Sequence, residues 1–155
     1  MYVTNQRDTR PTHPSTLIAT LGTEPQVVTA AYDRLSAKGE NIRSVQVVHT
    51  QAMEPALDRA VAVLRDLSSK SFPLFLVPLV DSVGFPLADV ETPAASESVF
   101  RTLYKLVWEA KREGLRVHLS IAGGRKTLAV FGMTVAQRLF DDDDHLWHLF
   151  SAGEF

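Results

Sequence analysis

The stretch Arg116-Val-His-Leu-Ser-Ile-Ala-Gly-Gly-Arg-Lys-Thr-Leu-Ala-Val130 decides the fold of this chain. It begins as an apolar strand, passes through Gly123 and Gly124, and opens a helix at Arg125-Lys126-Thr127. The two glycines allow a sharp turn and a close approach of the backbone to a ligand. The helix start offers unpaired N–H groups and the positive end of its dipole, so the stretch predicts an anion site, and its two cations favour phosphate. The structural alternative is a tight turn with two solvated cations.

The spacing of the glycines excludes a nucleoside-triphosphate loop. That motif needs a glycine five positions before Gly124, where Leu119 stands, and a glycine followed directly by lysine. Here Arg125 separates the last glycine from the lysine. The anion site therefore belongs to another class of protein.

Composition points to one ordinary globular domain. The chain has 155 residues, of which 45% are hydrophobic and 22% charged. A formal net charge of -2 argues against binding to long nucleic acids, so any anion site is local. The chain has no cysteine, which excludes thiolate catalysis and disulfides. No apolar run reaches the roughly 18 residues of a membrane span, so we expect no membrane partner and a cytoplasmic protein.

Apolar periodicity divides the chain into alternating strands and helices. Residues 1–15 lack a period and predict a flexible leader, followed by one domain over residues 16–155. The run at 73–80 is nearly continuously apolar and predicts a strand buried on both faces, and residues 81–95 predict a loop long enough to serve as a lid. The predicted strands cover 16–20, 42–50, 73–80, 115–121 and 145–150, and the predicted helices 27–35, 56–67, 96–114 and 127–140.

This alternation predicts an α/β fold, a Rossmann-like parallel sheet of five or six strands flanked by helices. Ligands of such folds bind beyond the carboxyl ends of the strands, where the loops 21–25 and 122–126 both lie. In the first loop, Thr23 and Gln26 have the spacing of a capping box, with Pro25 in the first turn. The functional interpretation is that Thr20, Thr23 and the backbone of Gly22 line a second anion or ribose site.

Four segments together resemble a known family. The chain is similar to the CARF domains of type III CRISPR systems over about residues 16–150, and most similar to the standalone ring nucleases that degrade cyclic tetraadenylate. Both loops occur at the separation found in that family, which makes the resemblance specific. The segments are Leu17-Ile-Ala-Thr-Leu-Gly-Thr-Glu-Pro, Lys38-Gly-Glu-Asn-Ile, Val45-Gln-Val-Val-His-Thr and Ser120-Ile-Ala-Gly-Gly-Arg-Lys-Thr.

The resemblance implies a CARF-type homodimer that holds the cyclic ligand across its two-fold axis. It also implies cleavage without metal or cofactor: a ribose 2′-hydroxyl attacks the adjacent phosphorus and leaves linear diadenylate with a 2′,3′-cyclic phosphate, which switches off type III signalling. On this view Lys126 stabilises the phosphorane and Arg125 holds a non-bridging oxygen. Glu24 replaces a family serine, so it is either a general base or an ordinary helix-start acid, with Thr23 contacting the ribose.

Further ligand contacts are expected from two loops. The backbone turn contributes Ala122, Gly123, Gly124 and Thr127. The long loop contributes Asp81 and Phe85, with Phe85 stacked on adenine, or else Phe85 is simply tucked into a surface loop.

The histidines are weaker candidates. His49 ends a strand near the site and is a candidate proton donor to the leaving oxygen, while His118 is expected to fill a sheet position. His145 and His148 lie three apart in a predicted strand and so face opposite sides, which prevents a shared metal.

Two other features have structural interpretations. The acidic run 141–144 lacks the spacing of a calcium loop and predicts a solvated turn. Trp108 and Trp147 lie on apolar faces and predict core or dimer contacts.

Two function classes remain beside the enzyme. A CARF sensor would bind the cyclic oligoadenylate without cutting it and regulate a partner effector. An ordinary phosphate-binding Rossmann domain would share the fold alone.

Overall fold

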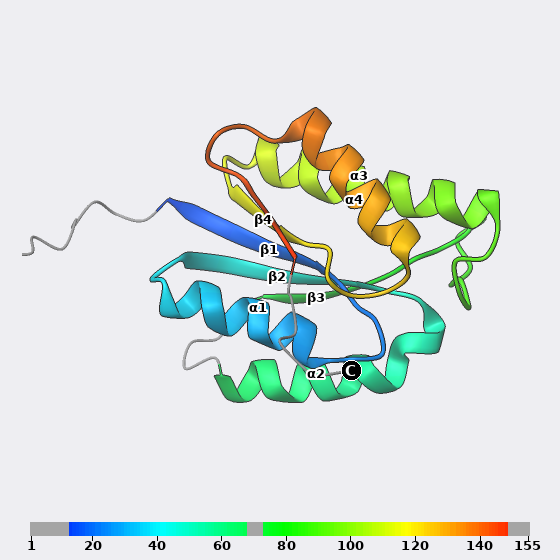
Figure 1. Cartoon of the computed structure of the whole chain (residues 1–155), viewed down its shortest axis with the longest axis horizontal. Helices are drawn as coiled ribbons and strands as arrows, with labels where there is room; N and C mark the ends of the chain where they lie inside the picture. The colour runs from blue at the N-terminus through cyan, green and yellow to red at the C-terminus, as the bar shows by residue number, and fades with distance from the viewer. Residues whose placement is uncertain (1–12, 68–72, 149–155) are drawn as a thin grey trace, which may run out of the picture.

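The computed structural model describes residues 13–67 and 73–148 as a five-stranded parallel sheet with helices on both faces (Figure 1). A short 3-10 helix, η1 (Gln51–Met53), precedes the second α-helix. The strands are β1 (Pro14–Thr20), β2 (Asn41–His49), β3 (Leu74–Pro78), β4 (Arg116–Ser120) and β5 (His145–Trp147). The helices are α1 (Gln26–Ala37), α2 (Glu54–Leu67), α3 (Pro93–Arg112) and α4 (Lys126–Leu139).

The strand order is β3-β2-β1-β4-β5, with all neighbours parallel. The direction in which the chain adds strands reverses between β1 and β4, and in open α/β sheets this switch point is where ligands bind. The loops after β1 and β4 are therefore neighbours at the carboxyl edge of the sheet. The predicted Rossmann-like fold is confirmed.

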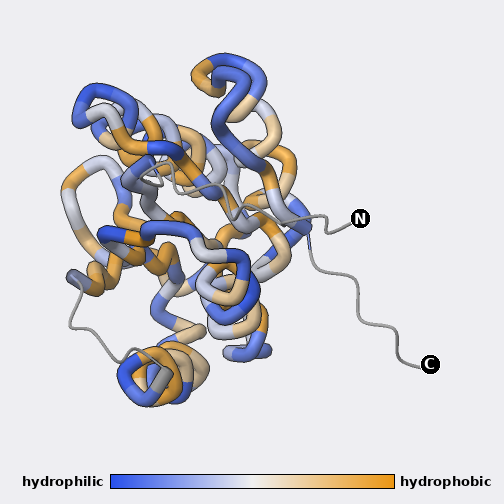
Figure 2. The backbone as a smooth tube through the Cα atoms, turned by 90° about the vertical axis from the view of Figure 1, so that its left-hand side faces the viewer, coloured by the Kyte–Doolittle hydropathy of each residue, from blue (hydrophilic) through white to orange (hydrophobic). Residues whose placement is uncertain are grey.

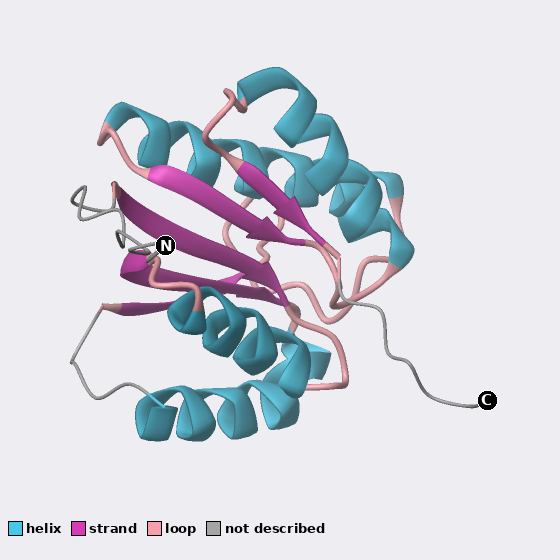
Figure 3. Ribbon diagram, turned by 60° about the vertical axis from the view of Figure 1, so that its left-hand side comes forward, coloured by secondary structure: helices cyan, strands magenta, loops and turns pink. Residues whose placement is uncertain are grey.

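Each face of the sheet has its own apolar core. On β1, Ile18 packs with residues of α3 and α4, whereas Leu17 and Ala19 pack with α1 and α2, because successive strand side chains point to opposite faces. Figure 3 shows the two helix layers above and below the strands. Blue and orange alternate along the helices in Figure 2, as expected of elements with one face on the sheet.

The element boundaries that differ from the predictions include those of β1, α3 and β5. β1 begins at Pro14, two residues early, while the rest of the predicted leader, residues 1–12, lies outside the described residues. α3 begins at Pro93 instead of residue 96, because the Thr92 hydroxyl accepts a hydrogen bond from the Ala95 N–H at 3.1 Å and proline suits the first turn. β5 ends at Trp147, and the predicted strand residues 149 and 150 lie outside the described residues.

The prediction that the third strand is buried on both faces is wrong. Phe75 is 52% exposed and Leu76 46% exposed. The cause is the strand order, which places β3 at an edge of the sheet, so that it pairs with β2 alone among the described strands. A continuous apolar run occurs both in edge strands and in central strands of a sheet, so composition alone does not predict which of the two a strand will be.

The segment between β3 and α3, predicted as a loop long enough to serve as a lid, is bonded to η1 and packed on the core in its second half. The Leu87 and Ala88 carbonyls accept hydrogen bonds from Gln51 N and Ala52 N at 2.9 and 3.1 Å. Val90 is buried in the core on the α3 and α4 side. The segment is thus fastened to η1 at the end nearer the site.

In the part of the chain that the structure describes, no helix has the length and apolar character needed to cross a membrane.

Candidate functional site

The loops after β1 and β4 touch through their backbones. A Cβ atom built on Gly22 would lie 2.5 Å from the nitrogen of Gly124, and one built on Gly123 would lie 2.2 Å from the carbonyl oxygen of Thr20. No real Cβ contact is that short, so glycine is required at both positions. Gly124 also has φ of 84°, a conformation that glycine adopts at little cost. The glycine-rich turn therefore serves loop packing as well as ligand approach.

Thr20 links the two loops by a buried side-chain hydrogen bond. Its side chain is fully buried, and its hydroxyl donates to the Gly123 carbonyl at 2.7 Å. Thr20 was expected to contact the ligand, but the structure places its hydroxyl inside the packed loops. Its contribution to a site is to hold the Gly123 turn against β1.

A cavity of about 410 Å³ opens above these loops. Its wall draws on the segments that follow β1, β2, β3 and β4, all at the carboxyl edge of the sheet. It is lined by Leu21, Gly22, Thr23, Glu24, Val27, Thr50, Met53, Asp89, Ala122, Gly123, Gly124, Arg125 and Leu128.

Most residues expected at the site line this cavity. Those that do so are Gly22, Thr23, Glu24, Ala122, Gly123, Gly124 and Arg125. Lys126 and Thr127 are not part of the lining; they are the first two residues of α4, directly after Arg125. Lys126 is exposed, and within the described residues its ammonium forms no ion pair.

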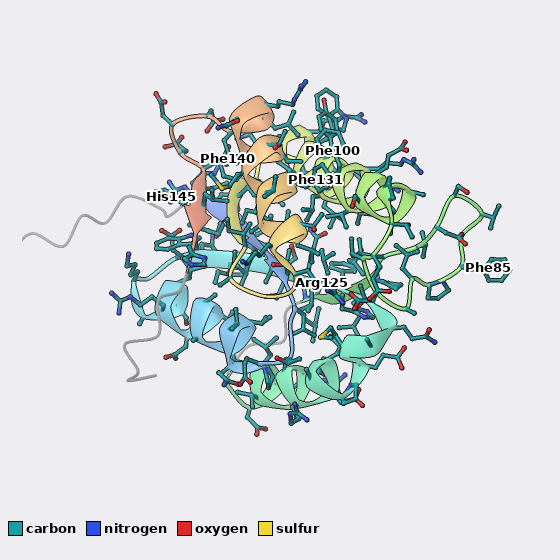
Figure 4. All side chains as sticks on the ribbon, turned by 45° about the vertical axis from the view of Figure 1, so that its right-hand side comes forward. Phe85, Phe100, Arg125, Phe131, Phe140 and His145 are labelled. Carbon is teal, nitrogen blue, oxygen red and sulfur yellow. The ribbon has the colours of Figure 1, made fainter. Side chains whose placement is uncertain are left out.

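The structure does not bring Asp81 and Phe85 to the cavity. The Asp81 carboxylate caps its own turn, accepting hydrogen bonds from Val83 N and Phe85 N at 2.9 Å each. The Phe85 ring is exposed and lies on the outer part of the loop, well apart from Arg125 (Figure 4). A short Asx turn explains why the Asp81 carboxylate binds its own loop instead of the cavity.

The predicted capping box in the first loop is absent. The residue before α1 is Pro25, and no side chain of the described residues caps the helix. Gln26 instead donates to the Glu24 carboxylate at 2.5 Å. Within the described residues the Thr23 hydroxyl has no hydrogen-bond partner, and Thr23 stands exposed at the cavity rim.

Arg125 is held by two carboxylates from the segment before α3. Its Nε donates to Asp89 Oδ1 at 2.9 Å, its Nη2 reaches the other oxygen of Asp89, and Nη2 also lies 3.2 Å from Glu91. The hydrogen bond from Arg125 lowers the pKa of Asp89, and the same contact raises the pKa of Arg125. Arg125 therefore lines the cavity with much of its positive charge already balanced by Asp89 and Glu91.

Among the residues that the structure describes, no side chain caps the start of α4. Arg125 occupies the N-cap position in extended conformation without a side-chain hydrogen bond to the helix. The Leu128 N–H is bonded to the Arg125 carbonyl, so the N–H groups of Lys126 and Thr127 are the ones that suit an anion beside the cavity.

Sequence reasoning missed Thr50, Met53 and Asp89 as lining residues. Thr50 follows β2 directly, and Asp89 lies in the segment that follows β3. Since all the strands are parallel, every segment after a strand emerges at the same edge of the sheet. Applied to all the strands, that rule predicts that the segments containing Thr50 and Asp89 lie beside the site.

His49 and His118 lie below the surface. His49 is buried, with Nδ1 3.1 Å from the Thr50 carbonyl oxygen, and it is not part of the cavity lining. His118 fills a sheet position as expected, and its Nδ1 accepts a hydrogen bond from Trp147 Nε1 at 3.1 Å. Burial lowers the pKa of His118, although Glu40 opposes that shift.

The rings of β5 stack beside His118. The His145 ring lies 5.4 Å from His118, and the Lys38 ammonium sits 4.8 Å from the centre of the Trp147 ring. His148 follows the end of β5 instead of lying within the strand. Among the described residues no group of three or more histidine or acidic side chains is placed to hold a metal ion.

The acidic run 141–144 is only partly the solvated turn that was expected. The Asp144 side chain is fully buried, accepting from Val117 N at 2.7 Å and from the Lys111 ammonium at 2.6 Å. Asp141 remains largely exposed and pairs with the same lysine. The turn therefore anchors β4 as well as joining α4 to β5.

The two tryptophans have different environments. Trp147 packs against the core on the α1 and α2 side. Trp108 is exposed on α3, in a groove that it shares with Phe100 and Tyr104. The Phe100 ring contacts Phe131 of α4 with 5.9 Å between ring centres, and both lie on the upper helix layer in Figure 4.

Comparison with known proteins agrees with this architecture. A solved structure, described as that of a type III CRISPR defence DNA nuclease activated by cyclic oligoadenylate, matches with 24% identity and a TM-score of 0.59. The match covers 90% of this chain and 19% of the other, and it shows the shared fold. No curated protein matches the chain. The model of the CRISPR-associated protein NE0113 family matches residues 24–155. The CRISPR association drawn from the sequence is thereby confirmed: the chain belongs to the CRISPR-associated protein NE0113 family.

Proposed function

We propose that this protein binds a cyclic oligoadenylate in the cavity and cleaves it as a metal-independent ring nuclease, with cyclic tetraadenylate as substrate. The observation that carries the proposal is the backbone contact between the loops after β1 and β4. That contact puts Thr23 and Glu24 in the same cavity wall as Arg125, with Lys126 adjoining. These are the positions that the family resemblance assigns to ligand binding and cleavage.

The size of the cavity supports a dimeric site. About 410 Å³ is near the lower end of the roughly 300–1,000 Å³ typical of small-molecule sites, and a ring of four nucleotides needs more than one such cavity. On α4, which starts at the site, Val130 and Met133 are exposed apolar residues spaced by almost one turn. A second copy packed on this face would place two cavities around one ring with matching two-fold symmetry.

The chemistry asked of the protein is positioning and charge stabilisation, because the attacking 2′-hydroxyl belongs to the substrate. The open N–H groups at the start of α4 suit a phosphate oxygen. The ammonium of Lys126, which forms no ion pair with the described residues, then stabilises the charge that develops on the phosphorane. Thr23 has its hydroxyl available to orient a ribose.

Glu24 has two roles open to it in this scheme. As a carboxylate in the cavity wall it can accept the proton of the attacking hydroxyl. Its hydrogen bond from Gln26 holds it at the helix start, which suits a purely structural acid equally well.

The second candidate function is a sensor that binds the cyclic ligand without cutting it. The observation in its favour is the charge of the cavity wall, where Glu24 and Asp89 outnumber Arg125. Two carboxylates near a phosphodiester oppose the build-up of negative charge in a cleavage reaction.

The test is to incubate the protein with labelled cyclic tetraadenylate in the presence of a chelator and to follow products by chromatography. We expect linear diadenylate with a 2′,3′-cyclic phosphate end. Lys126→Ala should slow cleavage by about 100-fold or more while leaving ligand binding within about tenfold, because loss of one transition-state donor typically costs 10²–10³ in rate.

Lys105→Ala is the matched control, since Lys105 is an exposed lysine of α3 away from the cavity. It should cleave like the wild type. Tight binding without product would leave the sensor, and absence of both binding and product would contradict both candidates.

A further inference from the structure

Arg125 is held along one edge of its guanidinium group. Asp89 accepts from Nε and Nη2 together, and Glu91 adds a single contact to Nη2. Within the described residues no hydrogen bond engages Nη1, so its two N–H donors are available. Arg125 lines the cavity and retains its Nη1 donors for a ligand, while the edge formed by Nε and Nη2 is already occupied by Asp89.

The two carboxylates differ in how firmly they are placed. Asp89 lies between Ala88, whose carbonyl is bonded to η1, and Val90, which is buried. The Val90 N–H donates to Asp89 Oδ1 at 2.7 Å, and the Asp89 side chain is only 28% exposed. The Glu91 side chain is 70% exposed. Asp89 is thus a fixed point and Glu91 a loosely placed neighbour.

A fixed carboxylate on a half-exposed arginine reduces the conformational freedom of that arginine. Arginine loses a rotamer-rich side chain's entropy when it is ordered on a ligand, and prior ordering removes that loss from binding. The same carboxylate also brings negative charge into a cavity proposed for phosphate, which opposes binding. The geometry decides between these effects, because the Asp89 contact leaves Nη1 free instead of covering the whole guanidinium.

We propose that Asp89 is a positioning residue for ligand binding, acting through Arg125. It holds the guanidinium at the cavity wall so that Nη1 donates to a non-bridging phosphate oxygen of the ligand. This inference rests on the proposed function, since the ligand is the cyclic oligoadenylate. It assigns a role to Asp89, a residue of the segment after β3. Neither the loop motifs nor the family resemblance includes Asp89.

The experiment compares Asp89→Asn with Glu91→Gln as matched variants. Each removes one carboxylate charge from the same arginine, but only the first abolishes the bidentate contact. Binding of cyclic tetraadenylate is measured by calorimetry or fluorescence for both variants, for Arg125→Ala, and for the double variant Asp89→Asn with Arg125→Ala. Thermal melting of each variant shows whether the fold is retained.

We expect Asp89→Asn to weaken binding about fivefold although it removes a negative charge, in line with the ordering cost of one long side chain. Glu91→Gln should bind as well as the wild type or up to about threefold more tightly. In the Arg125→Ala background, the Asp89 substitution should have no further effect, which a merely structural role for Asp89 would not produce.

Three outcomes would overturn the inference: binding of Asp89→Asn equal to that of the wild type, tighter binding by this variant, or an Asp89 effect that persists without Arg125. Tighter binding would identify Asp89 as a competitor of phosphate for the arginine. A wild-type protein that binds no cyclic oligoadenylate would refute the proposed function itself, which the wild-type measurement distinguishes from a failure confined to Asp89.

Discussion

The two ends of β4 are built in opposite ways. At its start, buried polar side chains hold the strand: Asp144 binds the Val117 N–H and Lys111, and the Trp147 indole donates to His118. After its end, Gly123 and Gly124 carry no side chain, and the backbone of Gly123 lies directly against β1, where the buried Thr20 hydroxyl donates to its carbonyl. Charged and aromatic side chains fix one end, and close backbone contact without Cβ atoms shapes the other.

This difference indicates which end of β4 can present backbone N–H groups to a ligand. At the start of β4, side-chain hydrogen bonds occupy the Val117 N–H and the Lys111 ammonium. At the far end, no side chain among the described residues caps α4, so the N–H groups of Lys126 and Thr127 have no capping partner there. Under the proposed function, stability and binding therefore belong to different ends of one strand.

The largest expected effect is at the start of β4. Asp144→Ala leaves Lys111 and the Val117 N–H without a buried partner, and we expect it to reduce the free energy of unfolding by about 3 kcal/mol. Lys111 is sensitive to this loss: burial acts to lower its pKa, and the hydrogen bonds that its ammonium donates to Asp141 and Asp144 outweigh burial and raise it. Urea unfolding followed by circular dichroism measures the change.

Asp141→Ala is the control for that variant, because Asp141 pairs with the same lysine but is mostly exposed. Its effect should stay below about 1 kcal/mol. Equal losses in the two variants would show that burial does not distinguish the two carboxylates.

A smaller effect on stability, with a larger effect on binding, is expected at the end of β4. The added methyl of Gly123→Ala would lie 2.2 Å from the Thr20 carbonyl oxygen, so the loops must separate, at a cost of about 2 kcal/mol. We also expect loss of cyclic tetraadenylate binding, measured under conditions where the variant is folded.

Gly39→Ala separates the two effects of the glycine substitution. Gly39 has φ of 81° but nothing within 4 Å of its Cβ position, so the change costs about 1 kcal/mol of backbone strain and leaves the cavity intact. Normal binding by Gly123→Ala would break the link between loop contact and ligand site.

The smallest effect concerns pH and returns to the start of β4. Burial lowers the pKa of His118 below 6.5 in the folded state, against the pull of Glu40 and with smaller contributions from His145 and Arg116. Below pH 6.5 the unfolded chain therefore takes up a proton that the folded protein resists. The free energy of unfolding should fall as the pH drops through this window, until the folded-state pKa is reached.

His118→Gln should flatten that pH dependence, whereas His13→Gln, at an exposed residue before β1, should not. Urea midpoints measured between pH 7 and pH 5 test both. An unchanged slope in His118→Gln would exclude His118 as its source.

The sequence was sufficient for the fold because its signals were local. Apolar periodicity located the strands and helices, and their strict alternation left a parallel sheet as the consistent arrangement. The errors arose where the environment of a residue depends on contacts that its local sequence does not specify. Burial of Phe75 depends on the strand order, and a capping role for Thr23 depends on the direction in which the Gln26 side chain points.

The two glycine loops and Arg125 could be predicted to line the cavity, but the carboxylate that pairs with Arg125 could not. Gly22, Gly123 and Gly124 stand in motifs whose spacing identifies the two loops. Asp89 stands 36 residues before Arg125, and no local pattern pairs them. Such pairing emerges only when β2 and β3 are placed beside β1.

The direct contact between the glycines of the two loops also constrains how this protein family can diversify. A side chain introduced on one loop would push against the main chain of the other, so neither bend can be remodelled independently. Under the proposed function, a change in ligand preference is then expected to come from the rim of the cavity, from residues such as Thr23 and Glu24, because the two glycine bends can change only together. Substitutions meant to fit another ligand to the proposed site should begin with those rim positions.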